Sequence, residues 1–440
     1  MIMSNFYSVA ELAGNQLYKE GDIFVLCGEL FGRGYANGLV NEAKKRKMKI
    51  IGFTVGRRDS DKTLRPLNDE ELAISEANLG GKIINIPMEA GFDMETVDGV
   101  SPVDMLQSLK QHNWDEFNPD EKLIDACREK GKARFNKNLQ QVIAEISKEI
   151  KPGANVHFAH TMAGGIPRSK IILVLANRVF KSLGERYIPS EKFWNSGIGM
   201  IVRKSFEEVT ADTFKYLLDG TSELRNSVIG NGGQVRYTAY GYHGTEIYIN
   251  GKYQWQTYTP YQQGHAKKRL EVHAENAWKE GIKATVYNCP EIRTNSSDIF
   301  IGVELSLFPL LDAMKVSGSE ELYKHHFKEC ASRLKEGSNI ADVIGEINNF
   351  QGSGTWLQFQ DFNKWPMENT LDLAEIMIGT SERITDMHVD KKNLISDYLS
   401  SLIIDGTGPL IFNHSDDPKS PVGWLGHNVI AAQLNKLLTQ

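Results

Sequence analysis

The feature that most constrains the fold is a glycine-rich turn near the start of the chain. The apolar run 23–26 precedes Gly28, Gly32 and Gly34, which are spaced G-x-x-x-G-x-G, and a helix-like stretch follows. Glycine lets a backbone turn tightly and approach a pyrophosphate, whose charge then lies at the helix N-terminus. The next apolar run, 49–55, completes a βαβ unit. The sequence therefore predicts dinucleotide binding, with an ordinary loop before a helix as the alternative.

The rest of the chain alternates apolar runs with helix-like stretches as far as residue 288. This alternation predicts an α/β fold, a Rossmann-like doubly wound parallel sheet with helices on both faces. The predicted strands are 22–27, 49–55, 82–86, 154–159, 197–203 and 283–288, and the predicted helices are 36–47, 68–78, 121–149, 168–183, 210–230 and 265–280.

Two segments interrupt the alternation and a third follows it. Residues 90–120 look like an insertion, and residues 234–260 are rich in tyrosine and contain Asn250-Gly251, a strong signal for a hairpin turn. After residue 315 the pattern is mostly helical. We expect one large domain over 1–440, made of a Rossmann-like NAD(P)-binding catalytic core at 20–315 with an inserted β-hairpin, and a mostly helical C-terminal appendage at 316–440.

Composition excludes several classes of function. The net charge of −6 disfavours nucleic-acid binding, and no apolar run approaches the roughly 20 residues of a membrane span. The four cysteines form no C-x-x-C pair, and the N-terminus lacks the features of a signal peptide. We expect a cytoplasmic protein with reduced thiols and no metal site.

The residues after the second strand predict which cofactor is used. Arg57 and Arg58 stand where a dinucleotide fold meets the adenosine ribose, and arginine there accommodates a 2′-phosphate. This favours NADPH, while Asp59 leaves NADH possible and a solvated turn is the alternative.

Small residues follow the predicted strand at 154–159, among them Ala163 and Gly164, and they leave room for a cofactor. We assign no catalytic role to His157 or His160.

A tyrosine-rich stretch followed by lysines is the candidate catalytic segment. A positive charge near a phenol stabilises the phenolate and lowers its pKa, which suits a tyrosine to act as an acid. Tyr258 lies nine residues before Lys267, a step that would place them on opposite faces of one helix, so Tyr258 must precede the helix. Tyr261 and Lys268, seven apart, form another possible pair. The alternative is a hairpin whose rings pack on the core.

The loop after the sixth strand, which begins Cys289-Pro290, should lie beside the nicotinamide. Thr294 offers a hydroxyl for the carboxamide. The apolar stretch 299–314 could form the wall of an acyl pocket, although a core helix is favoured for most of its residues.

These motifs resemble those of the short-chain dehydrogenase/reductase superfamily. The glycine spacing is similar to its cofactor turn, with Cys27 where threonine is usual, and Pro290-x-x-x-Thr294 is similar to its loop after the sixth strand. The usual Tyr-x-x-x-Lys is absent, and Tyr258-x8-Lys267 resembles instead the branch that contains FabV-type enoyl-ACP reductases and trans-2-enoyl-CoA reductases. The chain resembles most closely the FabMG-type enoyl-ACP reductases, through the phrases FGRGYANG at 31–38, HTMAGGIPR at 160–168 and YGYHGT at 240–245.

The resemblance implies NAD(P)H-dependent reduction of trans-2-enoyl thioesters, carried by ACP or CoA, in fatty acid synthesis. It implies that Tyr258 bonds the enolate oxygen, that Lys267 holds the nicotinamide ribose, and that Tyr240 or Tyr237 positions or protonates the enolate. The implied cofactor contacts are Gly28, Phe31, Gly32, Gly34, Arg57, Arg58, Ala163, Gly164, Lys267, Pro290 and Thr294. A carbonyl reductase and a non-catalytic NAD(P)-binding redox sensor are the alternatives.

Overall fold

A computed structural model describes residues 6–9, 17–257, 262–298, 301–359, 361 and 369–439. Its centre is an eight-stranded sheet in which every neighbouring pair is parallel. The strands are β1 (Phe6–Ser8), β2 (Ile23–Cys27), β3 (Lys49–Phe53), β6 (Lys82–Ile84), β7 (Val156–His160), β8 (Val235–Tyr240), β11 (Ala284–Asn288) and β12 (Val422–Trp424). This confirms the predicted α/β, Rossmann-like doubly wound fold.

The strand order places a crevice in the middle of the sheet. The order is β6-β3-β2-β7-β8-β11-β12-β1, so the chain runs outward from β2 in one direction and then from β7 in the other. The register aligns Cys27 with Phe53 on one side and with His160 on the other. The carboxyl ends of β2, β3 and β7 are therefore level, and ligands bind at such a switch point in open α/β sheets.

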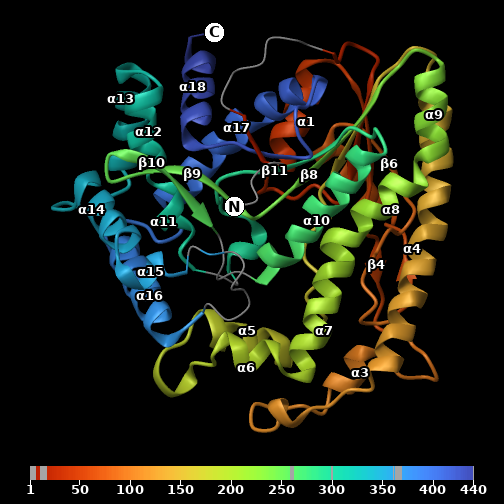
Figure 1. The fold of residues 1–440 in the computed structure, drawn as a ribbon, viewed down its shortest axis with the longest axis horizontal. Helices are drawn as coiled ribbons and strands as arrows, with labels where there is room; N and C mark the ends of the chain where they lie inside the picture. Colours follow the sequence, from red (N-terminus) through yellow and green to blue (C-terminus); the bar gives the residue numbers. More distant parts are fainter. Residues whose placement is uncertain are drawn as a thin grey trace.

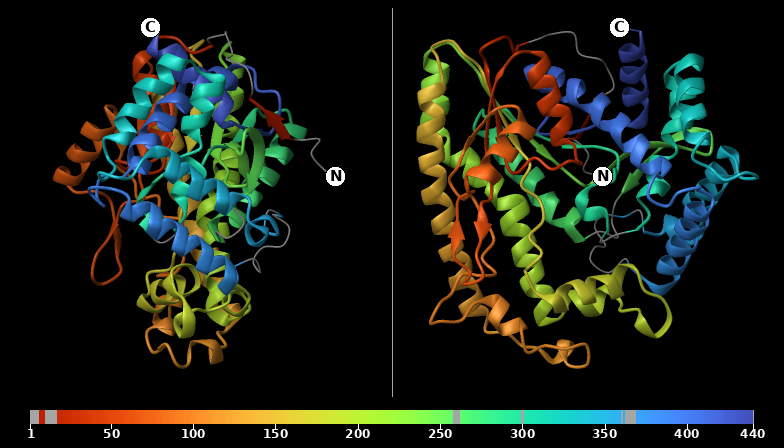
Figure 2. Two further views of the ribbon diagram at one scale, coloured as in Figure 1. Left: turned by 90° about the vertical axis from the view of Figure 1, so that its left-hand side faces the viewer. Right: turned by 180° about the vertical axis from the view of Figure 1, so that it is seen from behind.

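Alternate residues of the central strands face two separate cores. Phe24 and Leu26 of β2 pack beneath α1 (Ala36–Lys45) and α17 (Ile395–Asp416), whereas Ile23 and Val25 face the other side. That side is covered by α4 (Glu121–Glu149), α8 (Thr213–Gly220) and α10 (Gln262–Lys279), as Figures 1 and 2 show. Both faces of β2 are buried, as expected of a parallel sheet between helical layers.

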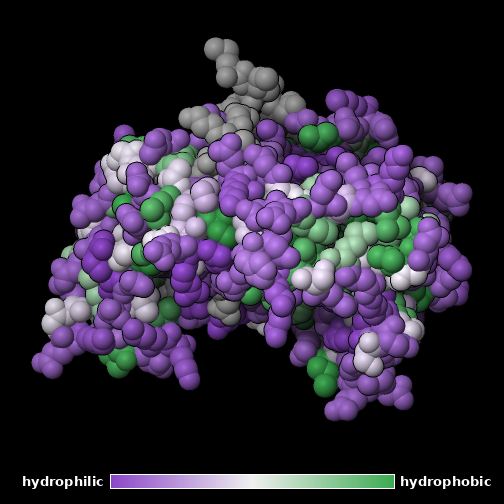
Figure 3. Space-filling model, turned by 90° about the horizontal axis from the view of Figure 1, so that it is seen from below, coloured by the Kyte–Doolittle hydropathy of each residue, from purple (hydrophilic) through white to green (hydrophobic). Residues whose placement is uncertain are grey.

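A third cluster of apolar side chains is formed by helices at the lower end of the molecule in Figure 1. Its helices are α3 (Pro102–Leu106), α5 (Lys170–Phe180), α6 (Ser190–Trp194) and α7 (Gly197–Phe206). Seen from below, the outer surface is mostly polar, with apolar side chains showing between the polar ones (Figure 3). The prediction of a strand at 197–203 is wrong: Ser196 caps α7, and Ile198, Ile201 and Val202 have helical spacing and are buried.

The tyrosine-rich segment divides into a sheet strand and a hairpin. Residues 235–240, expected in the hairpin, form β8 in the centre of the sheet, while β9 (Gly244–Ile249) and β10 (Lys252–Thr257) pair antiparallel. The predicted turn is confirmed, since Asn250 and Gly251 have φ values of 49° and 82°. The second small sheet pairs β4 (Arg57–Arg58) with β5 (Leu64–Arg65).

Residues beyond 315 contribute to the core as well as to the periphery. β12 extends the central sheet, and α17 lies against α1 in Figures 1 and 2. The division at residue 315 stays a prediction. The remaining elements are α2 (Asp69–Leu79), η1 (Trp114–Glu116), η2 (Gly184–Arg186), η3 (Glu207–Asp212, a π-helical segment), α9 (Ser222–Gly230), η4 (Asn295–Asp298), α11 (Val303–Leu307), α12 (Leu310–Ser317), α13 (Glu320–Ala331), α14 (Ile340–Gln351), α15 (Gly354–Leu357), α16 (Leu371–Asp386) and α18 (His427–Leu438).

Candidate active site

A cavity of about 410 Å³ lies at the carboxyl ends of the central strands. The turn after β2, the turn after β7, the end of β8, the loop after β11 and the first half of α10 each contribute to its wall. It therefore occupies the crevice that the strand order predicts. The residues that the sequence placed in the site and that line this cavity are Phe31, Gly34, Ala163, Tyr240, Lys267, Pro290 and Thr294.

The glycine-rich turn has the geometry of a close backbone approach. Gly28 has φ +137°, and a Cβ there would lie 2.7 Å from Oγ1 of Thr161, so only glycine fits between β2 and the exit of β7. The side chain of Asn37 holds the turn by donating to the carbonyls of Phe31 (2.9 Å) and Gly34 (3.0 Å). The N-terminus of α1 consequently faces the cavity from a fixed position.

The two histidines of β7 are structural. The ring of His160 bonds the hydroxyl of Thr213 at 2.8 Å, and that of His157 bonds Thr238 at 2.9 Å. Burial lowers the pKa of each imidazole to about 3, so both rings are neutral at ordinary pH. His160 lines the cavity as a neutral side chain.

Tyr240 faces the cavity, whereas Tyr237 does not. The two residues are three apart on β8 and so point to opposite faces of the sheet. The hydroxyl of Tyr237 is buried against Thr221 (2.7 Å) and Arg225 (3.0 Å). Of the two sequence alternatives for the second tyrosine, the structure brings Tyr240 alone to the cavity wall.

The Tyr240 phenol is held next to the turn by a second tyrosine. Its hydroxyl donates to the carbonyl of Tyr35 at 3.2 Å, and the two rings stack with centroids 5.3 Å apart. The Tyr35 hydroxyl in turn donates to the carbonyl of Pro290 in the loop after β11. Burial raises the pKa of Tyr240 well above the ordinary value of a phenol, so it is a neutral hydrogen-bond donor.

Lys267 brings a positive charge to the same cavity from α10. Burial lowers the pKa of its ammonium to about 8, and the ammonium interacts electrostatically with the thiol of Cys289, which is also in the wall. No carboxylate among the described residues pairs with Lys267. Tyr258 and Tyr261, the tyrosines predicted to accompany the lysines, lie outside the described residues.

Sequence reasoning missed a set of buried polar side chains behind the wall. Tyr242 donates to Glu291 at 2.5 Å, and the other oxygen of Glu291 accepts from Ser306 at 3.0 Å. A parallel network links His243 to Glu271 at 3.0 Å and Glu271 to Asn288 at 2.9 Å. These groups fix the loop after β8 to the loop after β11. The sequence did offer one signal for this network, because the acidic residue Glu291 directly follows Pro290 in the loop predicted to lie beside the nicotinamide.

Arg57 and Arg58 are near the turn but are held by carboxylates. Arg57 bonds Glu29, and Arg58 lies between Glu89 and Glu95 with a side chain only 10% exposed. Neither arginine lines the cavity, so the predicted role of both in binding a 2′-phosphate stays a prediction that this geometry does not favour.

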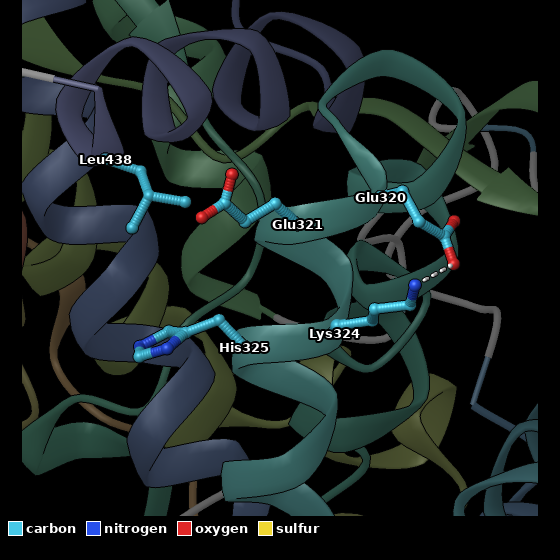
Figure 4. A pocket seen from close by; sticks show the side chains of 5 residues that line it. All are labelled: Glu320, Glu321, Lys324, His325 and Leu438. Carbon is cyan, nitrogen blue, oxygen red and sulfur yellow. Dashed lines mark ion pairs between the residues drawn. The ribbon is translucent and has the colours of Figure 1, made fainter.

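A second hollow of about 620 Å³ lies between α13 and α18 and has a different character (Figure 4). It is lined by Glu320, Glu321, Lys324, His325 and Leu438, and Lys324 pairs with Glu320 at 3.4 Å. Its lining is that of a charged surface. Among the described residues no cluster of side chains suits a metal ion, and none of the helices in that part of the chain is long and apolar enough to cross a membrane.

Comparison with known proteins identifies the family. The model of the family described as enoyl-acyl carrier protein reductase FabMG matches residues 5–434. A solved structure described as an apo form of FabMG is 50% identical, with a TM-score of 0.96, and the match covers 99% of this chain and 100% of that one. A structure described as NADH-bound FabMG is 43% identical, with a TM-score of 0.79 and the same coverage.

No curated protein matches the chain. The family match confirms the predicted reaction class, enoyl-ACP reduction, and with it the predicted dependence on a nicotinamide cofactor. The chain belongs to the FabMG family of enoyl-acyl carrier protein reductases.

Proposed function

We propose that this chain reduces the C2=C3 bond of trans-2-enoyl groups carried by acyl carrier protein, at the cavity between β2, β7, β8 and β11. The observation that carries the proposal is that the glycine-rich turn, Tyr240 and Lys267 meet around this one cavity. When bound, the reduced nicotinamide supplies the hydride that C3 accepts. The electron pair of the double bond then forms an enolate, and a proton at C2 completes the saturated thioester.

The residues of the turn fit a dinucleotide. Gly28 lets the turn pack against Thr161 at the exit of β7, and the N-terminus of α1 offers amide groups to a pyrophosphate. On the nicotinamide side, Pro290 and Thr294 line the cavity, and the amide of Thr294 is fixed by a bond of 2.8 Å to the Ser297 hydroxyl. This geometry supports contacts of Gly34 and Thr294 with the cofactor, while the contact of Gly28 stays a prediction.

Tyr240 and Lys267 suit the charge that develops on the thioester oxygen. The neutral phenol of Tyr240 would donate its one O–H to the enolate oxygen by turning it away from the Tyr35 carbonyl, and a donor at this place lowers the barrier. Lys267 keeps the local field positive and has the reach to bind ribose hydroxyls. Tyr258 stays the predicted partner of Lys267. We also propose the relationship with FabV-type and trans-2-enoyl-CoA reductases that the Tyr258-x8-Lys267 spacing suggests.

The test is the substrate-dependent loss of reduced-nicotinamide absorbance with purified protein. We expect oxidation with a trans-2-enoyl-ACP, slower oxidation with the matching enoyl-CoA, and none with the matching 3-ketoacyl-ACP. Oxidation with the 3-ketoacyl-ACP alone would contradict the proposal and establish a carbonyl reductase. Cofactor binding without turnover of either substrate would point instead to a redox sensor.

A further inference from the structure

We propose that Glu29 makes this chain select NADH over NADPH, by holding Arg57 in an ion pair and presenting a carboxylate where a 2′-phosphate would lie. The inference rests on the proposed function, because it assumes that a nicotinamide dinucleotide binds along the glycine-rich turn. It concerns the adenosine end of that cofactor, which the catalytic residues do not touch.

The positions of the two residues define the adenosine side of the site. Glu29 directly follows Gly28 in the turn after β2 and lines the cavity. Arg57 lies four residues beyond the end of β3, the strand next to β2. In doubly wound dinucleotide folds the adenosine ribose lies between these two places, and a side chain there reads its 2′ position.

The two side chains form a bidentate ion pair. Nη1 of Arg57 donates to one carboxylate oxygen of Glu29 at 3.1 Å, and Nη2 donates to the other at 2.9 Å. The same Nη1 also donates to the carbonyl of Gly56 at 2.9 Å, and Nε lies 3.7 Å from Glu71. Both terminal nitrogens of the Arg57 guanidinium are thus bonded to Glu29. The same two nitrogens could otherwise donate together to a phosphate.

The neighbouring arginines offer no substitute for Arg57. Arg58 donates to Glu89 at 2.5 Å and to Glu95 at 3.1 Å, and also to the carbonyl of Lys62 at 2.6 Å. Taking this arginine from its partners would leave two buried carboxylates without their cation, which is costly. Arg65 is paired with Asp59 and Glu71.

The charges decide which cofactor is favoured. A carboxylate accepts hydrogen bonds from ribose hydroxyls, whereas the double negative charge of a 2′-phosphate would meet the Glu29 carboxylate and an arginine already neutralised by it. NADH therefore fits the site as it stands. NADPH would fit only if Glu29 lost its charge and Arg57 were released.

Fluorescence titration of NADH and of NADPH, with no acyl substrate present, tests this through the ratio of their Kd values. In wild type we expect NADH to bind tighter by about tenfold or more. Glu29→Gln should shift the ratio about tenfold toward NADPH, since it removes the repulsion and frees Arg57. The double variant Glu29→Gln/Arg57→Ala should lose the gain in NADPH affinity. Glu71→Gln is the control, because Glu71 also approaches Arg57 but lies outside the cavity wall, and its ratio should stay that of wild type.

The outcomes separate the inference from the proposed function. If wild type binds neither dinucleotide, the proposed function fails. If wild type binds them but prefers NADPH, or if Glu29→Gln leaves the ratio unchanged, the inference is overturned while the proposed function stands. A double variant that keeps the full gain of Glu29→Gln would also overturn it, because Arg57 would then have no part. Glu29→Ala, followed by thermal denaturation, repeats the test with a different side chain.

Discussion

Gly38 of α1 and Gly408 of α17 touch backbone to backbone. A Cβ on Gly408 would lie 2.3 Å from the carbonyl oxygen of Gly38, and a Cβ on Gly38 would lie 2.3 Å from that of Ile404. Any side chain at either position would force the two helices apart. The helix whose N-terminus faces the cofactor turn is therefore held in place by a helix from the C-terminal part of the chain.

This contact predicts that the C-terminal part affects cofactor binding. Asp397, near the start of α17, also pairs with Arg33 of the turn at 3.4 Å and with Arg293 of the loop after β11 at 3.2 Å. Both arginines belong to segments that border the cavity. The C-terminal part thus joins α1, the turn and the loop after β11.

Gly408→Ala should destabilise the protein and weaken NADH binding together. Overpacking of this kind costs about 1–3 kcal/mol, because the added methyl group meets backbone that cannot move aside cheaply. Thermal denaturation and NADH titration measure the two effects. Gly406→Ala is the matched control on the same helix: its Cβ would be 3.4 Å from a side-chain methyl of Ile430, so stability should hold or rise. Equal behaviour of the two variants would contradict the proposed role of the contact.

The affinity for NADH should fall as the pH rises through about 8. Burial lowers the pKa of the Lys267 ammonium to about 8. Below that pH the ammonium is charged and can bind ribose hydroxyls and favour the anionic cofactor, and above it the charge is lost. Titrations of NADH from neutral to alkaline pH measure this. Lys267→Met should bind weakly with no such step, and Lys267→Arg should move the step to higher pH.

Lys279→Met, at the exposed end of the same helix, is the control for that profile. It should keep the step at the position seen in wild type. If the NADH affinity of Lys267→Met still falls near pH 8, another group causes the pH dependence and the prediction is wrong.

Acid should destabilise the fold below pH 6.5, the ordinary pKa of histidine. Burial lowers the pKa of His157, His160 and His427 to about 3, so the unfolded chain binds protons that the folded chain does not. Each such histidine removes on the order of 1.4 kcal/mol of unfolding free energy per pH unit below its unfolded pKa. Their contribution is complete above pH 6.5 and lost as the pH falls toward about 3. Urea unfolding at several pH values measures the slope.

His427→Leu isolates one of these contributions. Neither ring nitrogen of His427 has a hydrogen-bond partner among the described residues, so the substitution removes a buried polar group without breaking a hydrogen bond there. We expect a shallower acid slope, whereas His325→Leu on the exposed face of α13 should leave the slope unchanged. An unchanged slope in His427→Leu would show that the histidine does not cause it.

The sequence predicted those parts of the fold that depend on neighbours along the chain. Gly28 and Gly34 lie in one strand-turn-helix segment, and Lys267 lies in one helix that faces the cavity, so local patterns sufficed for both. The strand β8 was missed because it is rich in tyrosine, like the hairpin that follows it. Its place in the centre of the sheet, where both of its faces are covered, depends on contacts with distant parts of the chain and could not be predicted from the local pattern. In the same way β12 joins β11 from a distant part of the chain.

The partners of the predicted cofactor arginines could not be read from the sequence. Glu89 and Glu95 lie 31 and 37 residues beyond Arg58, and Glu29 lies 28 residues before Arg57. Ion pairs of this range depend on how loops pack. The apolar run 197–203 was assigned as a strand because short runs carry little periodicity, although Ile198 and Ile201 have helical spacing.

The central claim is that hydride transfer takes place in the cavity that Tyr240 lines. The most direct measurement is a single turnover of a trans-2-enoyl-ACP with deuterated reduced cofactor, followed by mass spectrometry of the acyl chain. We predict deuterium at C3 in wild type, and a rate slower by roughly 100-fold in Tyr240→Phe with unchanged NADH affinity. Tyr237→Phe, on the opposite face of the same strand, should transfer deuterium at the wild-type rate. Deuterium absent from C3, or equal rates in the two tyrosine variants, would contradict the account.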